Sequence, residues 1–284
     1  MALGFGGPDN KLAAFKDAKA VIVPVPYGRT ASYRKGTENG PRAILEASDS
    51  LELFDEDLNK EIHAIGINTV PLLKVEGLES QEMISVVEDK VSDVFKHNKL
   101  PVVIGGEHAV TIGAVRAAKK KYKNLSILYF DAHCDLRDSY LGNKYSHACV
   151  ARRLLDIAPV VEAGVRSLSM EEFEFSSASD VKIIKMPDII KCPDWASAVK
   201  NILSKEVYIT IDLDVFDPSI MPSVGNPEPG GMGWYDFLNA AREIIRDKKI
   251  AGLDVVELCP IKDMAAPDYM AAKLIYKLLG HIFP

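Results

Sequence analysis

Two acidic clusters carry the residue types that could do chemistry in this 284-residue chain. Asp131, His133 and Asp135 alternate with other residues, and Asp212 and Asp214 repeat the same spacing. Along an extended backbone, residues two apart point to the same side, so each cluster could present its side chains to one point. Five such groups converging on one pocket indicate a metal site, and their number favours two ions. The simpler alternative is a pair of acidic turns that cap helices.

The elements that must position these clusters are apolar strands. The runs 126–130 and 207–211 read as buried strands, and each one ends directly before a cluster. A carboxylate at the end of a buried strand costs free energy unless a positive charge neutralises it. We therefore favour a bound cation over two helix caps.

Eight apolar runs predict strands: 20–25, 62–67, 101–104, 126–130, 160–164, 181–185, 207–211 and 251–256. Segments with helical spacing of apolar residues follow Pro41, Ser80, Asp194 and Gly233, and another helix is expected to begin near Thr111. This alternation predicts a parallel sheet covered by helices on both faces. The uneven spacing of the strands favours an open sheet over a closed barrel. No repeat or linker divides the chain, so we expect one domain over residues 1–284.

The carboxyl ends of four predicted strands carry polar residues. In an open α/β sheet, ligands bind beyond these ends. His108 follows strand 101–104 and Glu257 follows strand 251–256, and the two acidic clusters follow two further strands. His108 could instead cap the next helix, and Glu257 could be an ordinary turn residue. One shared site explains all four positions at once, and we prefer it.

The composition fits an ordinary soluble globular protein, with 48% hydrophobic and 26% charged residues. A net charge of −6 argues against a nucleic-acid surface. No apolar run approaches membrane-spanning length, and the first residues lack a signal-peptide pattern. The four cysteines form no CxxC pair, so we expect reduced thiols and a cytoplasmic location. Cys134 lies between two proposed ligands and is expected to point away from them, although a nucleophilic role stays open.

Four motifs, in their order and separations, resemble those of the ureohydrolase family, which includes arginase and agmatinase. They are Gly105-Gly106-Glu107-His108, Asp131-Ala132-His133-Cys134-Asp135, Asp212-Leu213-Asp214-Val215-Phe216-Asp217-Pro218 and Glu257-Leu258-Cys259-Pro260. The stretch 34–44 also resembles the access loop of the family. The chain departs from the common pattern at Glu107, where Asp is frequent, at Cys134, and at 258–260, where an Asn-Pro ending is frequent. None of these departures removes a proposed ligand.

The resemblance implies a three-layer αβα sandwich around a mostly parallel eight-stranded sheet, with two manganese ions per subunit. One ion would take His108, Asp131, Asp135 and Asp212, and the other Asp131, His133, Asp212 and Asp214, so that Asp131 and Asp212 bridge. An oxygen-rich set with two imidazoles independently suits Mn²⁺, while zinc and nickel stay open. The resemblance also implies a homo-oligomer, a trimer or a hexamer.

The activity that the resemblance implies is hydrolysis of a small cationic guanidino compound to urea and an amine. Metal binding lowers the pKa of water and makes hydroxide available at neutral pH. By resemblance, Glu257 pairs with the guanidinium group, and His147 transfers protons or contacts the substrate. Asp135 could relay a proton to the leaving amine. The simpler alternative for His147 is a surface or helix-capping histidine.

The loop 136–147 resembles that of agmatinases, and it lacks the Asn and hydroxyl residues with which arginases recognise an amino acid. We therefore expect agmatine as the substrate and putrescine as the product. Asp138 could attract the second cation of agmatine, or it could pair with Arg137. Guanidinobutyrate, arginine and guanidine stay open as substrates.

Two other classes of protein are alternatives to a ureohydrolase. A non-catalytic metal-dependent binding protein is disfavoured because all six proposed ligands are present. A histone-deacetylase-like amidohydrolase would need a different histidine-rich loop, which the sequence lacks.

Overall fold

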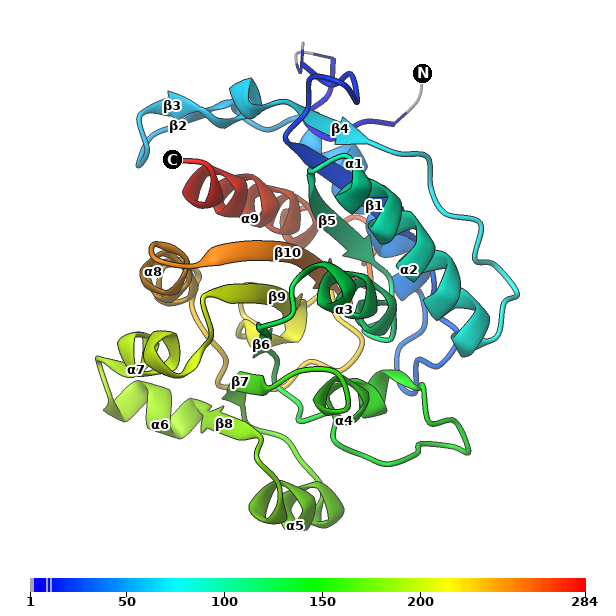
Figure 1. The fold of residues 1–284 in the computed structure, drawn as a ribbon, viewed down its shortest axis with the longest axis vertical. Coiled ribbons are helices and arrows are strands. Elements are labelled where there is room, and N and C mark those ends of the chain that lie inside the picture. Colours follow the sequence, from blue (N-terminus) through cyan, green and yellow to red (C-terminus); the bar gives the residue numbers. More distant parts are fainter. Residues whose placement is uncertain (1–2, 9, 11) are drawn as a thin grey trace.

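The computed structural model describes residues 3–8, 10 and 12–284. Its centre is an eight-stranded sheet with helices on both faces (Figure 1), in which every neighbouring pair is parallel. The strand order is β4 (Ile67–Thr69), β1 (Ala20–Val25), β5 (Leu100–Gly105), β10 (Lys249–Val256), β9 (Glu206–Asp212), β6 (Leu125–Phe130), β7 (Val160–Val165) and β8 (Lys182–Lys185). The expected three-layer α/β fold with an open sheet is confirmed. That the whole chain is one domain stays a prediction.

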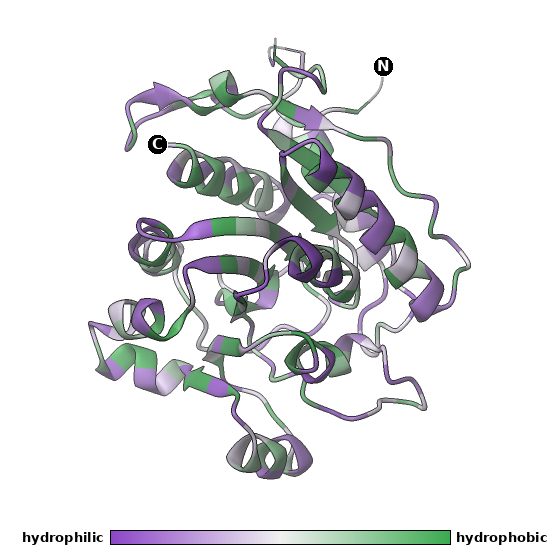
Figure 2. Ribbon diagram, in the orientation of Figure 1, coloured by the Kyte–Doolittle hydropathy of each residue, from purple (hydrophilic) through white to green (hydrophobic). Residues whose placement is uncertain are grey.

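Two apolar cores hold the helices against the sheet. One core packs α1 (Gly40–Ser48), α6 (Met186–Lys191), α7 (Trp195–Ile202), α8 (Trp234–Ile245) and α9 (Ala266–Ile282) on the first face. The other packs α2 (Ser80–Lys96), α3 (Val110–Lys121), α4 (Val150–Leu155) and one side of α5 (Met170–Ala178) on the second face. The central strands are hydrophobic along their length, whereas the helices are hydrophilic on their outer sides (Figure 2). Burial on both faces explains why these strands are near-continuous apolar runs.

The second predicted strand, 62–67, is largely wrong. Ile62–Ile65 forms a 3₁₀ helix, and the strand begins only at Ile67, after Gly66 turns the chain with a φ of 74°. A short apolar run is compatible with a strand or with a helical turn, because each of these structures can bury one of its sides. The short antiparallel pair β2 (Phe54–Asp55) and β3 (Lys60–Glu61) and the helices α5 and α6 were not predicted.

The predicted helix starts are close to those observed. Pro41 lies in the first turn of α1, and Asp194 directly precedes α7. The helix expected to start near Thr111 begins at Val110. Ser80 is the first residue of α2 rather than its cap, because Glu79 holds the N-cap position and forms a capping box with Glu82.

Gly106 is required by a close approach of two backbones at the end of β5. A Cβ atom on this residue would lie 2.0 Å from the carbonyl oxygen of Tyr27. The Gly106 N–H donates to Val25 O (2.9 Å), and the Glu107 N–H donates to Tyr27 O (2.7 Å). The segment that follows β1 is therefore held against the segment that follows β5, which brings Thr30 next to Glu107.

Candidate metal centre and active site

The candidate site lies at the carboxyl ends of four neighbouring strands, β5, β10, β9 and β6. His108 lies three residues beyond β5, and Asp131 directly follows β6. Asp212 is the last residue of β9, and Glu257 directly follows β10. The strand order thus brings together side chains that are far apart in the sequence.

The first group of possible ligands surrounds the Nδ1 atom of His108. This atom lies 3.1 Å from Asp131 Oδ2, 3.2 Å from Asp212 Oδ2 and 3.6 Å from Asp135 Oδ2. These are the four residues that the resemblance assigns to one ion. His108, Asp131 and Asp212 bring their ligand atoms close enough together to hold a metal ion.

The second group contains His133, Asp214 and again Asp131. His133 Nδ1 lies 2.9 Å from Asp214 Oδ2 and 3.5 Å from Asp131 Oδ1. Asp131 therefore turns one oxygen toward each histidine, as a bridging carboxylate would. Asp212 turns Oδ2 toward His108, and its Oδ1 accepts the N–H of Asp214 at 2.9 Å.

The electrostatics of the site fit a divalent cation. Burial, followed by repulsion from neighbouring carboxylates, raises the pKa of Asp135, Asp212 and Asp214. Burial and then the charge of Glu107 raise the pKa of Glu257 to about 8. Asp131 Oδ2 is buried and makes no hydrogen bond, although it lies near His108. A positive ion would relieve this excess of negative charge and give Asp131 Oδ2 a partner.

A hydrogen-bonded chain behind His108 fixes the orientation of its ring. Thr210 Oγ1 donates to Asp254 Oδ1 (2.5 Å), so it can only accept from the Nε2–H of His108 (2.8 Å). The lone pair on Nδ1 then faces the carboxylates, as a metal ligand requires. Tyr129 stacks on the ring with 4.6 Å between centroids and donates to Asp135 Oδ2.

The sequence analysis did not identify the hydrogen-bonded residues behind His108, although their positions in the strands give a signal. Thr210 and Asp254 are polar residues inside two otherwise apolar strands, and both are fully buried. A buried polar residue needs a hydrogen-bond partner, so such a position could have been read as support for the site.

Two of the proposed site residues have an uncommon backbone conformation. Asp135 has a φ of 50° and Glu257 a φ of 66°, in the left-handed region that favours glycine. Such conformations cost of order 1–3 kcal/mol and cluster at functional sites. Both side chains line the cavity described next.

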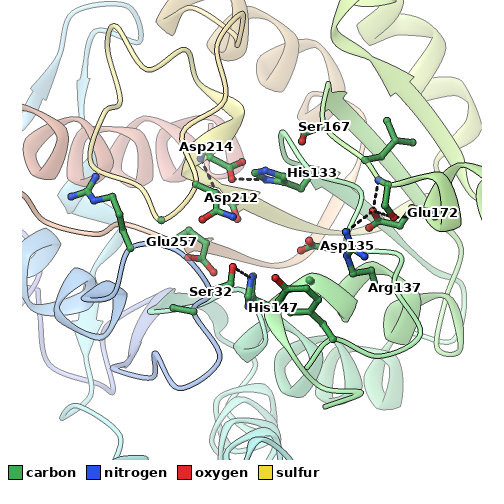
Figure 3. A pocket seen from close by; sticks show the side chains of 18 residues that line it. Ser32, His133, Asp135, Arg137, His147, Ser167, Glu172, Asp212, Asp214 and Glu257 are labelled. Carbon is green, nitrogen blue, oxygen red and sulfur yellow. Dashed lines mark hydrogen bonds and ion pairs between the residues drawn. The ribbon is translucent and has the colours of Figure 1, made fainter. Parts of the chain in front are cut away.

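A cavity of about 260 Å³ opens above the carboxylates (Figure 3). Residues that line it include Ser32, Arg34, His133, Asp135, Arg137, Tyr140, His147, Glu172, Asp212, Asp214 and Glu257. His147 faces the cavity, and its Nε2 lies 3.3 Å from Ser32 Oγ. Burial, followed by the positive charges of His133 and His108, lowers the pKa of His147 to about 4. The ring is therefore neutral near pH 7 and faces the cavity, which argues against the alternative of a surface histidine.

Asp138 does not line the cavity, so the structure gives no support to the suggestion that it attracts the substrate. Its exposed carboxylate pairs with Arg153 (2.9 Å) instead of Arg137. Arg137 lies 4.0 Å from Glu172, a buried residue whose side chain lines the cavity. Glu172 was missed because α5 was not predicted, although Ser169 and Glu172 form a capping box that marks its start.

Cys134 is buried in the core of the second face and does not line the cavity. Burial, followed by the charges of Glu162 and Glu172, raises the pKa of its thiol. A nucleophile needs an accessible thiolate, so these observations argue against a catalytic role for Cys134.

Comparisons with known proteins agree with this geometry. The model of the Arginase family matches residues 18–280. An N(1)-aminopropylagmatine ureohydrolase of Synechocystis sp. is 39% identical over 278 residues, which cover 95% of this chain and 91% of that protein. An agmatinase of Pyrococcus horikoshii is 34% identical over 93% of this chain and 92% of its own.

The structure of an agmatine ureohydrolase of Thermoplasma volcanium aligns with a TM-score of 0.90 at 33% identity, and the match covers 98% of this chain and 94% of that one. The expectation drawn from the four motifs is confirmed. The chain belongs to the arginase family, and it is a ureohydrolase.

Proposed function

We propose that the chain is a binuclear manganese enzyme that hydrolyses agmatine to putrescine and urea. The observation that carries this proposal is the pair of histidine–carboxylate groups that share Asp131 under one cavity. A single buried cluster could be structural, whereas two clusters that share a carboxylate beside an open cavity suit hydrolysis.

The proposed ligands of one ion are His108, Asp131, Asp135 and Asp212, and those of the other are Asp131, His133, Asp212 and Asp214. When bound, the metal lowers the pKa of water and supplies hydroxide at neutral pH. Oxygen-rich ligation favours Mn²⁺ over Zn²⁺.

The chain's own residues bind the substrate and move its protons. Glu257 offers a carboxylate to the guanidinium group and orients the carbon that is attacked. A C–O bond forms at this carbon, and the bond to the substituted nitrogen breaks. The leaving amine then needs a proton, which His147 or Asp135 can deliver because both line the cavity.

A second candidate substrate is the longer N(1)-aminopropylagmatine. The observation in its favour is the relative with that name, which is 39% identical, compared with 34% for the agmatinase of P. horikoshii. Both substrates carry cationic tails, so the comparison between them depends on how long a tail the cavity accepts.

The experiment that tests the proposal is urea release under Mn²⁺. We would compare kcat/KM for agmatine, N(1)-aminopropylagmatine, guanidinobutyrate, arginine and guanidine. Agmatine is expected to give the largest value. A larger value for the aminopropyl compound would replace the substrate and keep the activity, and no urea from any of the five would refute the proposal.

Two further proposals concern the setting of the enzyme. We propose a cytoplasmic location, which four free cysteines support, three of them buried. Among the described residues, none of the helices has the length and apolarity needed to cross a membrane. We also propose a homotrimer or homohexamer, which light scattering coupled to size-exclusion chromatography would test, and a stable monomer would contradict it.

A further inference from the structure

The hydroxyl of Thr30 has three partners, and its single proton decides how they bond. Thr30 Oγ1 lies 2.8 Å from Glu107 Oε1, 3.0 Å from the backbone N of His147 and 3.1 Å from His147 Nδ1. A hydroxyl can donate one hydrogen bond and accept two. The backbone N–H of His147 can only donate, so the roles of the other two partners depend on the state of Glu107.

Glu107 takes the proton of Thr30. This side chain is fully buried, and its Oε2 accepts the backbone N–H of Thr30 at 2.6 Å. Both oxygens of Glu107 face donors of Thr30, and such hydrogen bonds favour the charged form of a carboxylate. In that form Glu107 also accepts the hydroxyl proton of Thr30 through Oε1. Thr30 Oγ1 must then accept at its third contact, so the Nδ1 atom of His147 has to carry a hydrogen.

We infer that Glu107, acting through Thr30, holds His147 in the tautomer with its proton on Nδ1 and thereby leaves Nε2 as a proton acceptor facing the cavity. The inference rests on the proposed function for the use made of His147, whereas the tautomer itself rests on these contacts with Glu107 in its carboxylate form. Glu107 and Thr30 are positioning residues, because neither lines the cavity.

The role of His147 depends on this tautomer. Its Nε2 faces Ser32 Oγ at 3.3 Å and the cavity beyond. With a lone pair at this atom, the ring can take up a proton in the cavity and then return it to a leaving amine. With a hydrogen at Nε2, the neutral ring could only donate, and it would have to lose that hydrogen before it could accept another.

Ser146 offers the competing explanation. Its Oγ also lies near His147 Nδ1, at 3.3 Å, and could donate to it. This contact is longer than the contact with Thr30, and it lies near the limit of hydrogen-bond length. Ser146→Ala is therefore a matched control, since it removes a hydroxyl from the same ring atom and leaves Thr30 and Glu107 in place.

Glu107→Gln inverts the arrangement with almost no change in shape. The amide oxygen must face the Thr30 N–H, so the amide NH₂ faces Thr30 Oγ1 and donates to it. The Thr30 hydroxyl then donates to His147 Nδ1, and the ring proton moves to Nε2. Thr30→Val removes the link altogether, whereas Thr30→Ser keeps the hydroxyl and should restore the wild-type tautomer.

The test is the rate at which diethyl pyrocarbonate modifies His147 in the manganese-loaded enzyme at pH 8.5, followed by mass spectrometry of the peptide that contains it. The reagent attacks an unprotonated ring nitrogen, and in the wild type this is the accessible Nε2. We expect Glu107→Gln to slow the reaction about tenfold or more, the effect of one hydrogen bond, while Ser146→Ala and Thr30→Ser react like the wild type. A wild-type rate in both Glu107→Gln and Thr30→Val, or slowing in Ser146→Ala alone, would overturn the inference.

Steady-state kinetics and metal content complete the test. Glu107→Gln is expected to lower kcat for urea release by about 100-fold, within the usual contribution of acid–base catalysis, with little change in KM and with wild-type manganese content. A pure loss of structure would lower the metal content or raise KM as well, and Thr30→Ser would not share the wild-type behaviour in that case. If the wild type released no urea at all, the proposed function would fail, but the reactivity of His147 would still decide the inference.

Discussion

The backbone N–H of His108 donates a 2.7 Å hydrogen bond to Oε1 of Glu257. The turn after β5, which carries a proposed metal ligand, therefore holds the carboxylate that follows β10. Glu257 Oε1 is occupied by this bond, so Oε2 is the oxygen left to meet a guanidinium group. The carboxylate proposed to bind the substrate and the proposed metal centre are thus oriented by the same backbone.

Glu257→Gln is expected to lower kcat/KM while both metal ions remain bound. The amide can keep the hydrogen bond from His108, but it loses the charge that pairs with a guanidinium cation. A hydrogen bond to a charged group contributes about 1.5–3 kcal/mol, or roughly 10- to 150-fold in kcat/KM. Urea assays and metal analysis of the same preparation check this result, and metal loss equal to the loss of activity would contradict it.

Removal of metal should abolish activity and lower thermal stability. Without a cation, several buried carboxylates lie together next to the imidazoles of His108 and His133. A bound ion stabilises the folded state by mass action. Exhaustive dialysis against a chelator, followed by addition of Mn²⁺ or Zn²⁺, should restore turnover and the melting temperature, and Mn²⁺ should restore turnover better. Full activity in protein shown to be metal-free would refute the metal assignment.

Asp131→Asn should remove both ions, because Asp131 faces both histidines. Substitution of a residue that only hydrogen-bonds to a metal ligand typically lowers metal affinity by about 10- to 100-fold. Substitution of a ligand shared by two ions should lower it further. Asp138→Asn is the matched control, since Asp138 lies in the same loop region and pairs with Arg153 at the surface. Metal counting by atomic emission should give close to none for the first variant and the wild-type number for the second.

Thr210→Val should weaken metal binding without touching a ligand. It removes the acceptor that holds the Nε2–H of His108, so the ring can rotate or change its tautomer. The expected loss is about 10- to 100-fold in metal affinity, measured by competition with a fluorescent chelator. Tyr208→Phe removes a different hydroxyl that bonds to Asp254 but leaves His108 in contact with Thr210, so it should have the smaller effect.

Lys277 should contribute to stability in a pH-dependent way. Its buried ammonium contacts Asp57 (2.7 Å), Glu56 (2.9 Å) and Asp55 (3.2 Å). Burial opposes the charge, but these carboxylates raise the pKa of Lys277 above its ordinary value. Because the pKa of Lys277 is higher in the folded state, its contribution to stability is complete at any pH below the pKa in the unfolded state, about 10.4. This contribution is lost as the pH rises through the pKa in the folded state.

Lys277→Met should therefore lower the free energy of unfolding by about 3–5 kcal/mol at pH 7, because it leaves buried Asp55 without its partner. The difference from the wild type should stay constant up to about pH 10 and shrink above it. Denaturant melts across this range, with exposed Lys262→Met as the control, check the sign. A difference that grows toward alkaline pH would show that the cluster acts in another way.

The central strands and their polar ends were predictable from the sequence, for a physical reason. A parallel strand buried on both faces needs a continuous apolar run, so β6 and β9 stand out, and the ligands that follow them stand out against the apolar background. A run buried on one side only, such as Ile62–Ile65, carries no such signal and was assigned to the wrong structure.

The lining of the cavity away from the strand ends was not predictable in the same way. Asp138 lies in a loop and Glu172 in the first turn of α5, and the conformation of the loops places Glu172, but not Asp138, at the cavity. Thr30 reaches Glu107 only because the backbone after β1 passes against Gly106. Such contacts between distant segments leave no periodic pattern in the sequence.

The sheet ends on both sides in very short strands. β4 has three residues, and β8 has four, with an exposed lysine at each of its ends. Short edge strands, and the charged ends of β8, resist pairing with the edge of another molecule, which protects a long, apolar parallel sheet from aggregation. They also mean that this sheet offers little backbone for extension across a subunit boundary, so subunits that assemble must meet through helices and loops.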